Sequence, residues 1–353
     1  GVFHSLFSQR VLPRKERAPI LTGLFQSIMQ LFADFDETLI QRHVQEFQHA
    51  TGKRGKVNVT CLHKSKDAGR HQMVFSLVQE SGGNLVLKKD FQPNGRWIER
   101  ELSLFNRLQP YFARTEGLAV PTPVYLGEDK SFHITTFVPG RTATDMLQHP
   151  QSQAQANQVF RRCGSWLNHL HHFRPAAPTN IWTNWIFGEI DRLISAEGIY
   201  ARPTHYTAFL DQLQAEAQHF QASPCVQVFS HGDFHGGNLI LGKGTVCGLD
   251  LAYSAEKPAL YDVVDLLSSD VNNSRAAEDI GPGGIRRASV TFFFKTYRQP
   301  LSRPLLNFHL RARLLLELLH IQKSVALTKP RTQARFDALR HRLVLGFAQP
   351  LDS

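Results

Sequence analysis

The segment that decides the fold is residues 231–238, which read HGDFHGGN. It follows the apolar residues 226–229 and precedes a second apolar run at 239–241. Short apolar runs on both sides of a glycine-rich, polar stretch predict a loop between two strands. The loop therefore presents a carboxylate, Asp233, and an amide, Asn238, from a fixed framework.

The spacing of these polar residues indicates phosphoryl transfer from a nucleotide. That chemistry needs a carboxylate to orient the attacking hydroxyl, oxygen ligands for magnesium, a cation on the phosphates and an anchor for that cation. His231, Asp233 and Asn238 have the spacing of a kinase catalytic loop, in which the Asp accepts the substrate proton and the Asn binds metal. We predict Asp233 as the base and Asn238 as a magnesium ligand.

A second acid, Asp250, ends the apolar run 246–249, about one hairpin after the loop. We predict Asp250 as the principal metal carboxylate; alone, it and Asp262 would be read as caps of helices or turns. His231 and His235 are four residues apart but lack the intervening Glu and the helix of a zinc motif. We include His231 among the cofactor-site residues and expect its ring to make hydrogen bonds.

Upstream, the run 85–87 places Lys88 on a strand, and Glu101 lies on the helix that follows. A strand lysine and a helix glutamate form the phosphate-binding pair of protein kinases. Lys89 and Glu99 are close alternatives, and strand alternation puts Lys88 and Lys89 on opposite faces. We prefer Lys88, held by Glu101, and expect the loop 64–70, with Ser65, to cover the phosphates.

Hydrophobic periodicity divides the chain into a helical extension at 1–52, a strand-rich first lobe at 53–139 and a helix-rich second lobe at 140–353. The first lobe is expected to hold a five-stranded antiparallel sheet and one helix. Its strands are predicted at 56–62, 71–79, 84–89, 124–126 and 132–137, and its helix at 99–108. Helices are predicted within 21–50 and at 154–172, 185–196, 206–222 and 305–327, with the sole strand-like interruption at 226–251.

The bulk composition narrows the class of protein. The chain has 353 residues, 42% of them hydrophobic, and contains no apolar run of about eighteen residues, so we expect a soluble protein. The first thirty residues lack the zones of a secretory signal, and four widely spaced cysteines fit a reducing cytoplasm. The net charge of +10 favours anionic partners.

Taken in order, the motifs resemble the aminoglycoside phosphotransferase and choline kinase family over roughly residues 57–347. The resemblance rests on 231–238, then 248–250 and then Pro258, Tyr261 and Asp262. The Lys88 strand, the Glu101 helix, the turn at 137–140 and the pair at 170–171 also match. The family usually has other residues where Leu251, Ala252 and Lys257 stand.

The resemblance implies an α+β, bilobal protein-kinase-like fold with ATP or GTP and magnesium bound between the lobes. It implies phosphate transfer to a hydroxyl of a small molecule, such as an aminoglycoside, choline, homoserine, methylthioribose or a related sugar. The positive charge favours neutral or anionic acceptors over polycationic ones. The rival hypotheses are a pseudokinase scaffold and a protein kinase, the latter disfavoured because no Ala-Pro-Glu signature follows Asp250.

Several features carry weaker signals. We expect the acceptor pocket at 154–222 and 270–287, where Trp182, Trp185 and Tyr200 are candidate lining residues.

The glycine cluster 281–284 follows no predicted strand, so an ordinary loop is favoured over a phosphate cradle. The leucine stripe of 310–321 is expected in the core. The basic residues at 10–17 lack interleaved aromatics, so no nucleic-acid partner is expected.

Overall fold

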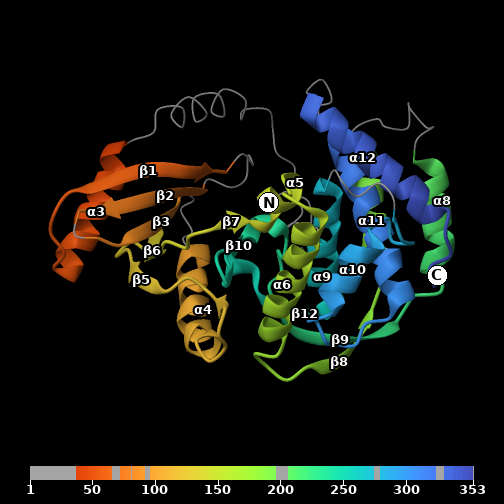
Figure 1. Ribbon diagram of the computed structural model, residues 1–353, viewed down its shortest axis with the longest axis horizontal. Coiled ribbons are helices and arrows are strands. Elements are labelled where there is room, and N and C mark those ends of the chain that lie inside the picture. The colour runs from red at the N-terminus through yellow and green to blue at the C-terminus, as the bar shows by residue number, and fades with distance from the viewer. Residues whose placement is uncertain are drawn as a thin grey trace, which may run out of the picture. The chain divides into compact units, whose positions relative to one another are not determined.

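The computed structural model describes residues 37–65, 72–80, 82–91, 96–195, 206–273, 279–322 and 330–352 (Figure 1). The chain divides into two compact units. The first comprises Gly1–Ser103 and Thr122–Phe137, and the second comprises Leu104–Pro121 and Val138–Ser353. The predicted helix before residue 37, the basic cluster at 10–17 and Tyr200 lie outside the described residues.

The first unit is built on a five-stranded antiparallel sheet in the order β1-β2-β3-β6-β5, which confirms the prediction. Every second side chain of β2 is buried, as expected for a strand with one face on a core. The strands are β1 (Val57–Lys64), β2 (Gln72–Gln79), β3 (Asn84–Asp90), β5 (Pro123–Leu126) and β6 (Phe132–Thr136).

Helix α3 (Glu37–Thr51) covers one face of this sheet. Its buried Ile40, Val44 and Phe47 recur at helical spacing and join one core with strand residues that include Phe75 and Phe132. The helix ends before Gly52, whose φ of +66° is the left-handed conformation that glycine adopts readily. The predicted helix end at Gly52 is therefore confirmed.

Helix α4 (Arg96–Phe112) extends beyond the predicted 99–108 at both ends and includes Pro110 near its C-terminal end. Ile98, Leu102, Phe105 and Leu108 are buried, as the periodicity predicts. The division into units falls within this helix, between Ser103 and Leu104.

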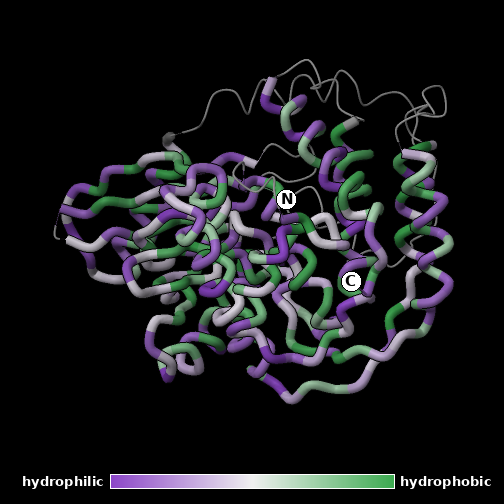
Figure 2. The backbone as a smooth tube through the Cα atoms, turned by 45° about the vertical axis from the view of Figure 1, so that its right-hand side comes forward, coloured by the Kyte–Doolittle hydropathy of each residue, from purple (hydrophilic) through white to green (hydrophobic). Residues whose placement is uncertain are grey.

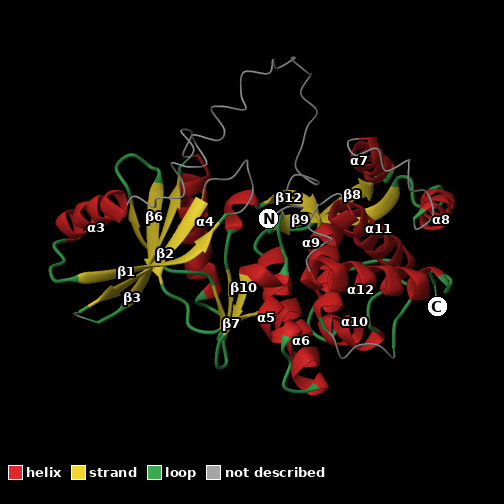
Figure 3. Cartoon of the chain, turned by 90° about the horizontal axis from the view of Figure 1, so that it is seen from above, coloured by secondary structure: helices red, strands yellow, loops and turns green. Residues whose placement is uncertain are grey.

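The second unit is mainly helical (Figure 3), as predicted. Figure 2 shows hydrophobic residues recurring between hydrophilic ones along its helices. In α11 the predicted leucine stripe is confirmed as core, with Leu310, Leu314 and Leu318 inaccessible to solvent. The helices are α5 (Ala143–Gln148), α6 (Gln153–His171), α7 (Asn184–Ser195), α8 (Thr207–Ala217), α9 (Ala259–Leu267), α10 (Arg287–Phe294), α11 (Arg303–Gln322) and α12 (Pro330–Phe347).

The second unit also contains two small sheets, so the prediction of a single strand-like interruption was wrong. One has the order β4-β11-β10-β7 and the other β12-β9-β8. Strands β8 and β12 carry prolines and no alternating pattern, and they form because each pairs with an edge of β9. The strands are β4 (Leu118–Ala119), β7 (Arg141–Thr142), β8 (Ala177–Ile181), β9 (Ser223–Ser230), β10 (Leu239–Leu241), β11 (Val246–Gly248) and β12 (Ala255–Pro258).

In the described ranges, no helix combines the length and the apolar character needed to cross a bilayer.

Two glycines test how tightly the second unit is packed. A Cβ on Gly248, in β11, would come within 2.1 Å of the buried Trp166 ring, whereas a Cβ on Gly188, inside α7, would meet no atom within 4 Å. We predict that Gly248→Ala lowers the free energy of unfolding by roughly 2 kcal/mol or more through overpacking. Gly188→Ala should raise it by about 0.5–1 kcal/mol because alanine favours a helix.

Urea denaturation of the two variants and the unchanged protein measures both effects. A Gly248→Ala protein as stable as the unchanged one would contradict this description of the core around Trp166.

Candidate active site

The HGDFHGGN segment links β9 to β10, and its last three residues form the 3₁₀ turn η2 (Gly236–Asn238). This confirms the predicted loop between strands. Phe234 anchors the loop in the core: its side chain is inaccessible to solvent and stacks on Trp166, with ring centroids 5.6 Å apart. The polar residues on either side of Phe234 are thereby held at fixed positions.

The backbone at the start of the loop is fixed by the carboxylate of Asp262, from α9. Its Oδ2 accepts hydrogen bonds from the His231 N–H at 2.7 Å and from Ser230 Oγ at 2.8 Å, and its Oδ1 accepts one from the Gly232 N–H at 2.9 Å. His171 Nε2, at the end of α6, lies 3.0 Å from Oδ2. Asp262 is therefore a buried acceptor for the loop and not a helix cap.

Burial opposes ionisation of Asp262, but the hydrogen bond and charge of His171, together with the backbone donors, outweigh it and lower its pKa to about 2. The carboxylate is therefore ionised at any working pH. Gly232 also requires glycine, because its φ is +82° and a Cβ there would lie 2.4 Å from the Tyr253 carbonyl oxygen.

His231 links the loop to Asp250. Its Nδ1 accepts a hydrogen bond from the Asp233 N–H at 3.3 Å, and its Nε2 lies 2.8 Å from the Leu249 carbonyl oxygen. This pattern corresponds to a ring protonated on Nε2. With both ring nitrogens on backbone groups and the side chain buried, the arrangement favours a supporting role over the predicted direct cofactor contact.

Asp250 follows the predicted hairpin of β10 and β11 and has a left-handed backbone, with φ 59° and ψ 51°. Such a conformation is uncommon for a residue other than glycine and is often found at functional sites. Its neighbour Leu249 is held on both sides, by His231 and by an N–H that donates to the Asn238 carbonyl at 2.8 Å. Asp250 is thereby brought next to the catalytic loop.

Asp233 and Asn238 are connected directly. The Asn238 Nδ2 donates to the Asp233 carbonyl oxygen at 2.9 Å and lies 3.4 Å from its Oδ2. Because Nδ2 is the donor, Oδ1 is the amide atom left to bind a cation. Together with the Asp250 carboxylate it supplies oxygen ligands of the kind that Mg²⁺ prefers, so these residues fit the predicted metal.

His235, for which the sequence predicts no role, lies beside the predicted base. Its Nδ1 accepts from the Gly237 N–H at 3.0 Å, and its Nε2 lies 3.8 Å from Asp233 Oδ2. Burial lowers the pKa of His235 to about 4, against the opposing pull of the Asp233 charge. The ring is therefore neutral at pH 7 and places no positive charge beside Asp233.

In the first unit, Lys88 and Glu101 form the ion pair expected from the sequence. Lys88 Nζ lies 2.8 Å from Glu101 Oε2, and both side chains are buried. The alternatives are separated: Lys89 Nζ contacts Ser131 and Asp129, while Glu99 pairs with the exposed Lys130. The ion pair is therefore the predicted Lys88 with Glu101, and its role in binding phosphate stays a prediction.

Comparison with known protein families identifies the family of this chain. A model of the phosphotransferase enzyme family matches residues 67–289, which is more than half of the chain and includes the segments that hold Lys88, Asp233 and Asp250. The chain belongs to the phosphotransferase enzyme family. Its members are small-molecule kinases that phosphorylate hydroxyl groups. No curated protein sequence matches the chain significantly.

Solved structures confirm the fold of this phosphotransferase. An amicoumacin kinase, in complex with AMP-PNP, Ca²⁺ and Ami, superposes with a TM-score of 0.57 at 16% identity, covering 92% of this chain and 97% of its own. A choline/ethanolamine kinase family protein from Mesorhizobium loti gives 0.52 at 16% identity over 89% and 96%. A spectinomycin phosphotransferase, in complex with ADP and spectinomycin, gives 0.51 at 12% over 84% and 92%.

Three residues near the site, Leu251, Ala252 and Lys257, differ from the usual family pattern, and all three fit into the packed structure. Leu251 and Ala252 are buried in the 3₁₀ turn η3 (Leu251–Tyr253) after Asp250. Lys257 lies on β12 beside the loop, since a Cβ on Gly232 would come within 2.9 Å of its Nζ. The departures therefore surround the site without breaking its hydrogen bonds.

Two predicted groups of ligand-contacting residues stay predictions. Ser65 lies at the end of β1, and its N–H donates to the Gln72 carbonyl oxygen at 2.9 Å. The rest of its loop lies outside the described residues. Of the candidate acceptor residues, Trp182 is 57% exposed and Trp185 packs edge-on against Tyr261.

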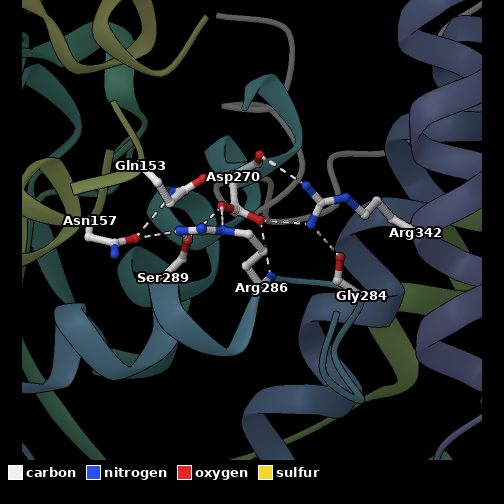
Figure 4. A network of polar contacts seen from close by, with 7 residues as sticks. All are labelled: Gln153, Asn157, Asp270, Gly284, Arg286, Ser289 and Arg342. Atoms are coloured by element: carbon white, nitrogen blue, oxygen red, sulfur yellow. Dashed lines mark hydrogen bonds and ion pairs between the residues drawn. The ribbon is translucent and has the colours of Figure 1, made fainter. Parts of the chain in front are cut away.

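A second buried carboxylate, Asp270, lies at the centre of a network of polar contacts (Figure 4). It accepts from Ser289 Oγ at 2.6 Å, from Arg342 Nη1 of α12 at 2.7 Å and from the Arg286 N–H at 3.0 Å. The preceding residue, Ser269, accepts the Gly236 N–H through its Oγ at 3.3 Å. The turn η4 (Ser268–Asn272) therefore joins the loop to the C-terminal helix.

The glycine cluster 281–284 is part of this network. The Gly284 carbonyl oxygen lies 3.4 Å from Arg342 Nη1, and a Cβ on Gly346 of α12 would come within 2.8 Å of the Gly284 nitrogen. These contacts favour the structural loop over a phosphate cradle.

We predict that Asp262→Asn lowers the free energy of unfolding at pH 7 by roughly 3 kcal/mol, because several buried donors lose an ionised acceptor. The lowered pKa of Asp262 fixes the sign of the pH dependence. The carboxylate stabilises the fold above its ordinary pKa near 4, and this contribution is lost as the pH falls towards about 2.

The stability difference between the unchanged protein and Asp262→Asn should therefore stay constant above about pH 5 and shrink between about pH 5 and pH 2 in urea titrations. Asp337→Asn, at an exposed position of α12, is the control and should change stability by less than about 0.5 kcal/mol. A stability difference between the unchanged protein and Asp262→Asn that stays constant with pH would contradict the conclusion that the Asp262 carboxylate is ionised in the folded protein.

Proposed function

We propose that this phosphotransferase transfers the γ-phosphoryl group of ATP to a hydroxyl of a small molecule, with Mg²⁺ bound to the nucleotide. The observation that carries the proposal is the hydrogen-bonded set Asp233, Asn238 and Leu249–Asp250, organised by one buried carboxylate. GTP is the alternative nucleotide. The structural neighbours solved with AMP-PNP and with ADP support a nucleotide as phosphate donor.

In this proposal, Asp233 orients the acceptor hydroxyl. The hydroxyl oxygen forms a bond to the γ-phosphorus while the bond from that phosphorus to the bridging oxygen of ADP breaks, and the hydroxyl proton passes to the Asp233 carboxylate. Asp233 is 5% exposed, and Asn238 Nδ2 lies near its Oδ2, so the carboxylate has a defined orientation before substrate binds. Such preorganisation is a main source of catalysis in phosphoryl transfer.

Asn238 Oδ1 and the Asp250 carboxylate would hold the Mg²⁺. When bound, the ion would neutralise charge on the nucleotide phosphates. The chain's contribution is to fix both oxygens through backbone contacts: Asn238 through Asp233, and Asp250 through Leu249 and His231. The left-handed backbone of Asp250 is the cost of placing its carboxylate there.

Lys88 would bind the nucleotide phosphates, and Glu101 would hold the lysine in place. Burial acts to raise the pKa of Glu101, but the Lys88 charge and the contact with His133 outweigh it and lower the pKa to about 2. The Glu101 carboxylate is therefore ionised at neutral pH. Lys88 would thus supply the phosphate-binding cation.

The acceptor would be a neutral or anionic hydroxyl compound, since the chain carries a net charge of +10. The structural neighbours include proteins named for amicoumacin, for spectinomycin and for choline or ethanolamine, so antibiotics and amino alcohols belong in any test.

All four cysteines are free, which supports the proposal of a reducing cytoplasm.

The test is a screen of sugars, sugar phosphates, amino alcohols and antibiotics with ATP and Mg²⁺, in which ADP release is measured. We predict ADP release that depends on an acceptor hydroxyl. Absence of release with every acceptor, together with tight nucleotide binding, would instead support the pseudokinase.

With the acceptor so found, Asp233→Asn should lower kcat by about 10²–10⁴-fold, because the amide cannot take up the proton. The dissociation constant for the nucleotide should change by less than about 2-fold. Asp211→Asn, at an exposed position of α8, is the control and should keep full activity. Full activity of Asp233→Asn would refute the assigned base.

A further inference from the structure

His133 contacts the ion pair that would bind phosphate, although no sequence motif pointed to it. Its Nε2 lies 3.1 Å from Glu101 Oε2, the same oxygen that accepts from Lys88 Nζ at 2.8 Å. All three side chains are buried, with at most 9% of each residue exposed. A strand lysine, a helix carboxylate and a strand histidine therefore meet at one oxygen atom.

The sheet register creates this arrangement. His133 of β6 is the antiparallel partner of Lys88 of β3. Residues directly opposite each other in an antiparallel pair project from the same face of the sheet, with Cβ atoms about 5 Å apart. Glu101 of α4 then reaches both side chains from one direction.

The hydrogen-bond roles are constrained by the charge of Glu101. An ionised carboxylate can only accept, so the His133 nitrogen that faces it must carry a proton. A carboxylate held by a single flexible lysine could turn about its terminal torsion and take the ammonium with it. A second donor on the same oxygen, from a ring fixed in a sheet, removes that freedom.

We propose that His133 is a positioning residue for Lys88: by donating to Glu101 Oε2, it fixes the carboxylate that sets where the ammonium lies for the nucleotide phosphates. This inference rests on the proposed function of Lys88. His133 itself touches neither nucleotide nor acceptor in this scheme. Its loss should therefore weaken nucleotide binding and leave the acceptor's KM unchanged.

The experiment compares His133→Leu, which removes the donor, with His133→Gln, whose amide nitrogen can occupy the position of Nε2. Calorimetric titration with AMP-PNP and Mg²⁺ gives the dissociation constant without any acceptor. We expect His133→Leu to raise it by about 10-fold, the loss of one hydrogen bond to a charged group, and His133→Gln to stay within about 2-fold of the unchanged protein. If His133→Leu does not fold, His133→Asn, whose shorter amide does not reach Glu101, replaces it.

His43→Leu is the matched control, because His43 is a buried histidine of the same unit that packs against Phe132 and is not part of the proposed nucleotide site. It should leave the dissociation constant unchanged even if it lowers stability. Lys88→Met tests the phosphate-binding role of Lys88 separately from the positioning role of His133. It should weaken nucleotide binding at least as much as His133→Leu does.

Nucleotide affinity that is unchanged in His133→Leu but lost in Lys88→Met would overturn the role of His133 and leave the proposed function standing. Unchanged affinity in both variants would remove the phosphate-binding role of Lys88 and the inference with it. An equal loss in the Leu and Gln variants would show that the ring's packing, and not its donor, is what matters, and would also overturn the proposal.

Discussion

The second unit depends on one buried carboxylate. Asp262 lies outside the catalytic loop in sequence, yet its two oxygens accept hydrogen bonds from the first backbone groups of that loop and face His171 from a third element. A buried charge is tolerated only when such donors surround it, so the requirement to satisfy Asp262 fixes the loop backbone. The positions of Asp233 and, through His231, of Asp250 follow from that constraint.

The parts of the site that the sequence could predict are those encoded by short spacings. Asp233 and Asn238 share one loop, Asp250 ends the hairpin that follows, and the two-residue period of a strand puts Lys88 and Lys89 on opposite faces. Local geometry relates such residues whatever the rest of the fold does. The five-stranded sheet was predictable because its strands are short apolar runs separated by polar or glycine-rich turns, and β2 in addition alternates between buried and less buried residues.

The parts that escaped prediction depend on contacts between distant segments. His133 meets Glu101 only because β3 and β6 pair in one register, and Arg342 reaches Asp270 across 72 residues. Strand β8 has no pattern of its own and is defined by its partner β9. Helix α9 is short and buried on nearly all sides, and a short apolar run does not by itself distinguish a helix from a strand.

The division of roles between the two units explains why the fold alone does not name an acceptor. Solved relatives named for amicoumacin, spectinomycin and choline or ethanolamine share this framework at 12–16% identity. In the proposed mechanism the groups that act on phosphate belong to the sheet and to the loop 231–238, so the acceptor would be recognised by other residues, which can differ between proteins of the same fold.

In the proposed mechanism, the loop ordered by Asp262 holds Asn238 and Asp250 as the two ligands of one metal site beside the base Asp233. A crystal structure with AMP-PNP and Mn²⁺ in place of Mg²⁺ tests it most directly, because anomalous scattering locates the ion. We expect one ion coordinated by Asn238 Oδ1 and the Asp250 carboxylate. An ion bound elsewhere, with both of these oxygens unligated, would contradict the account.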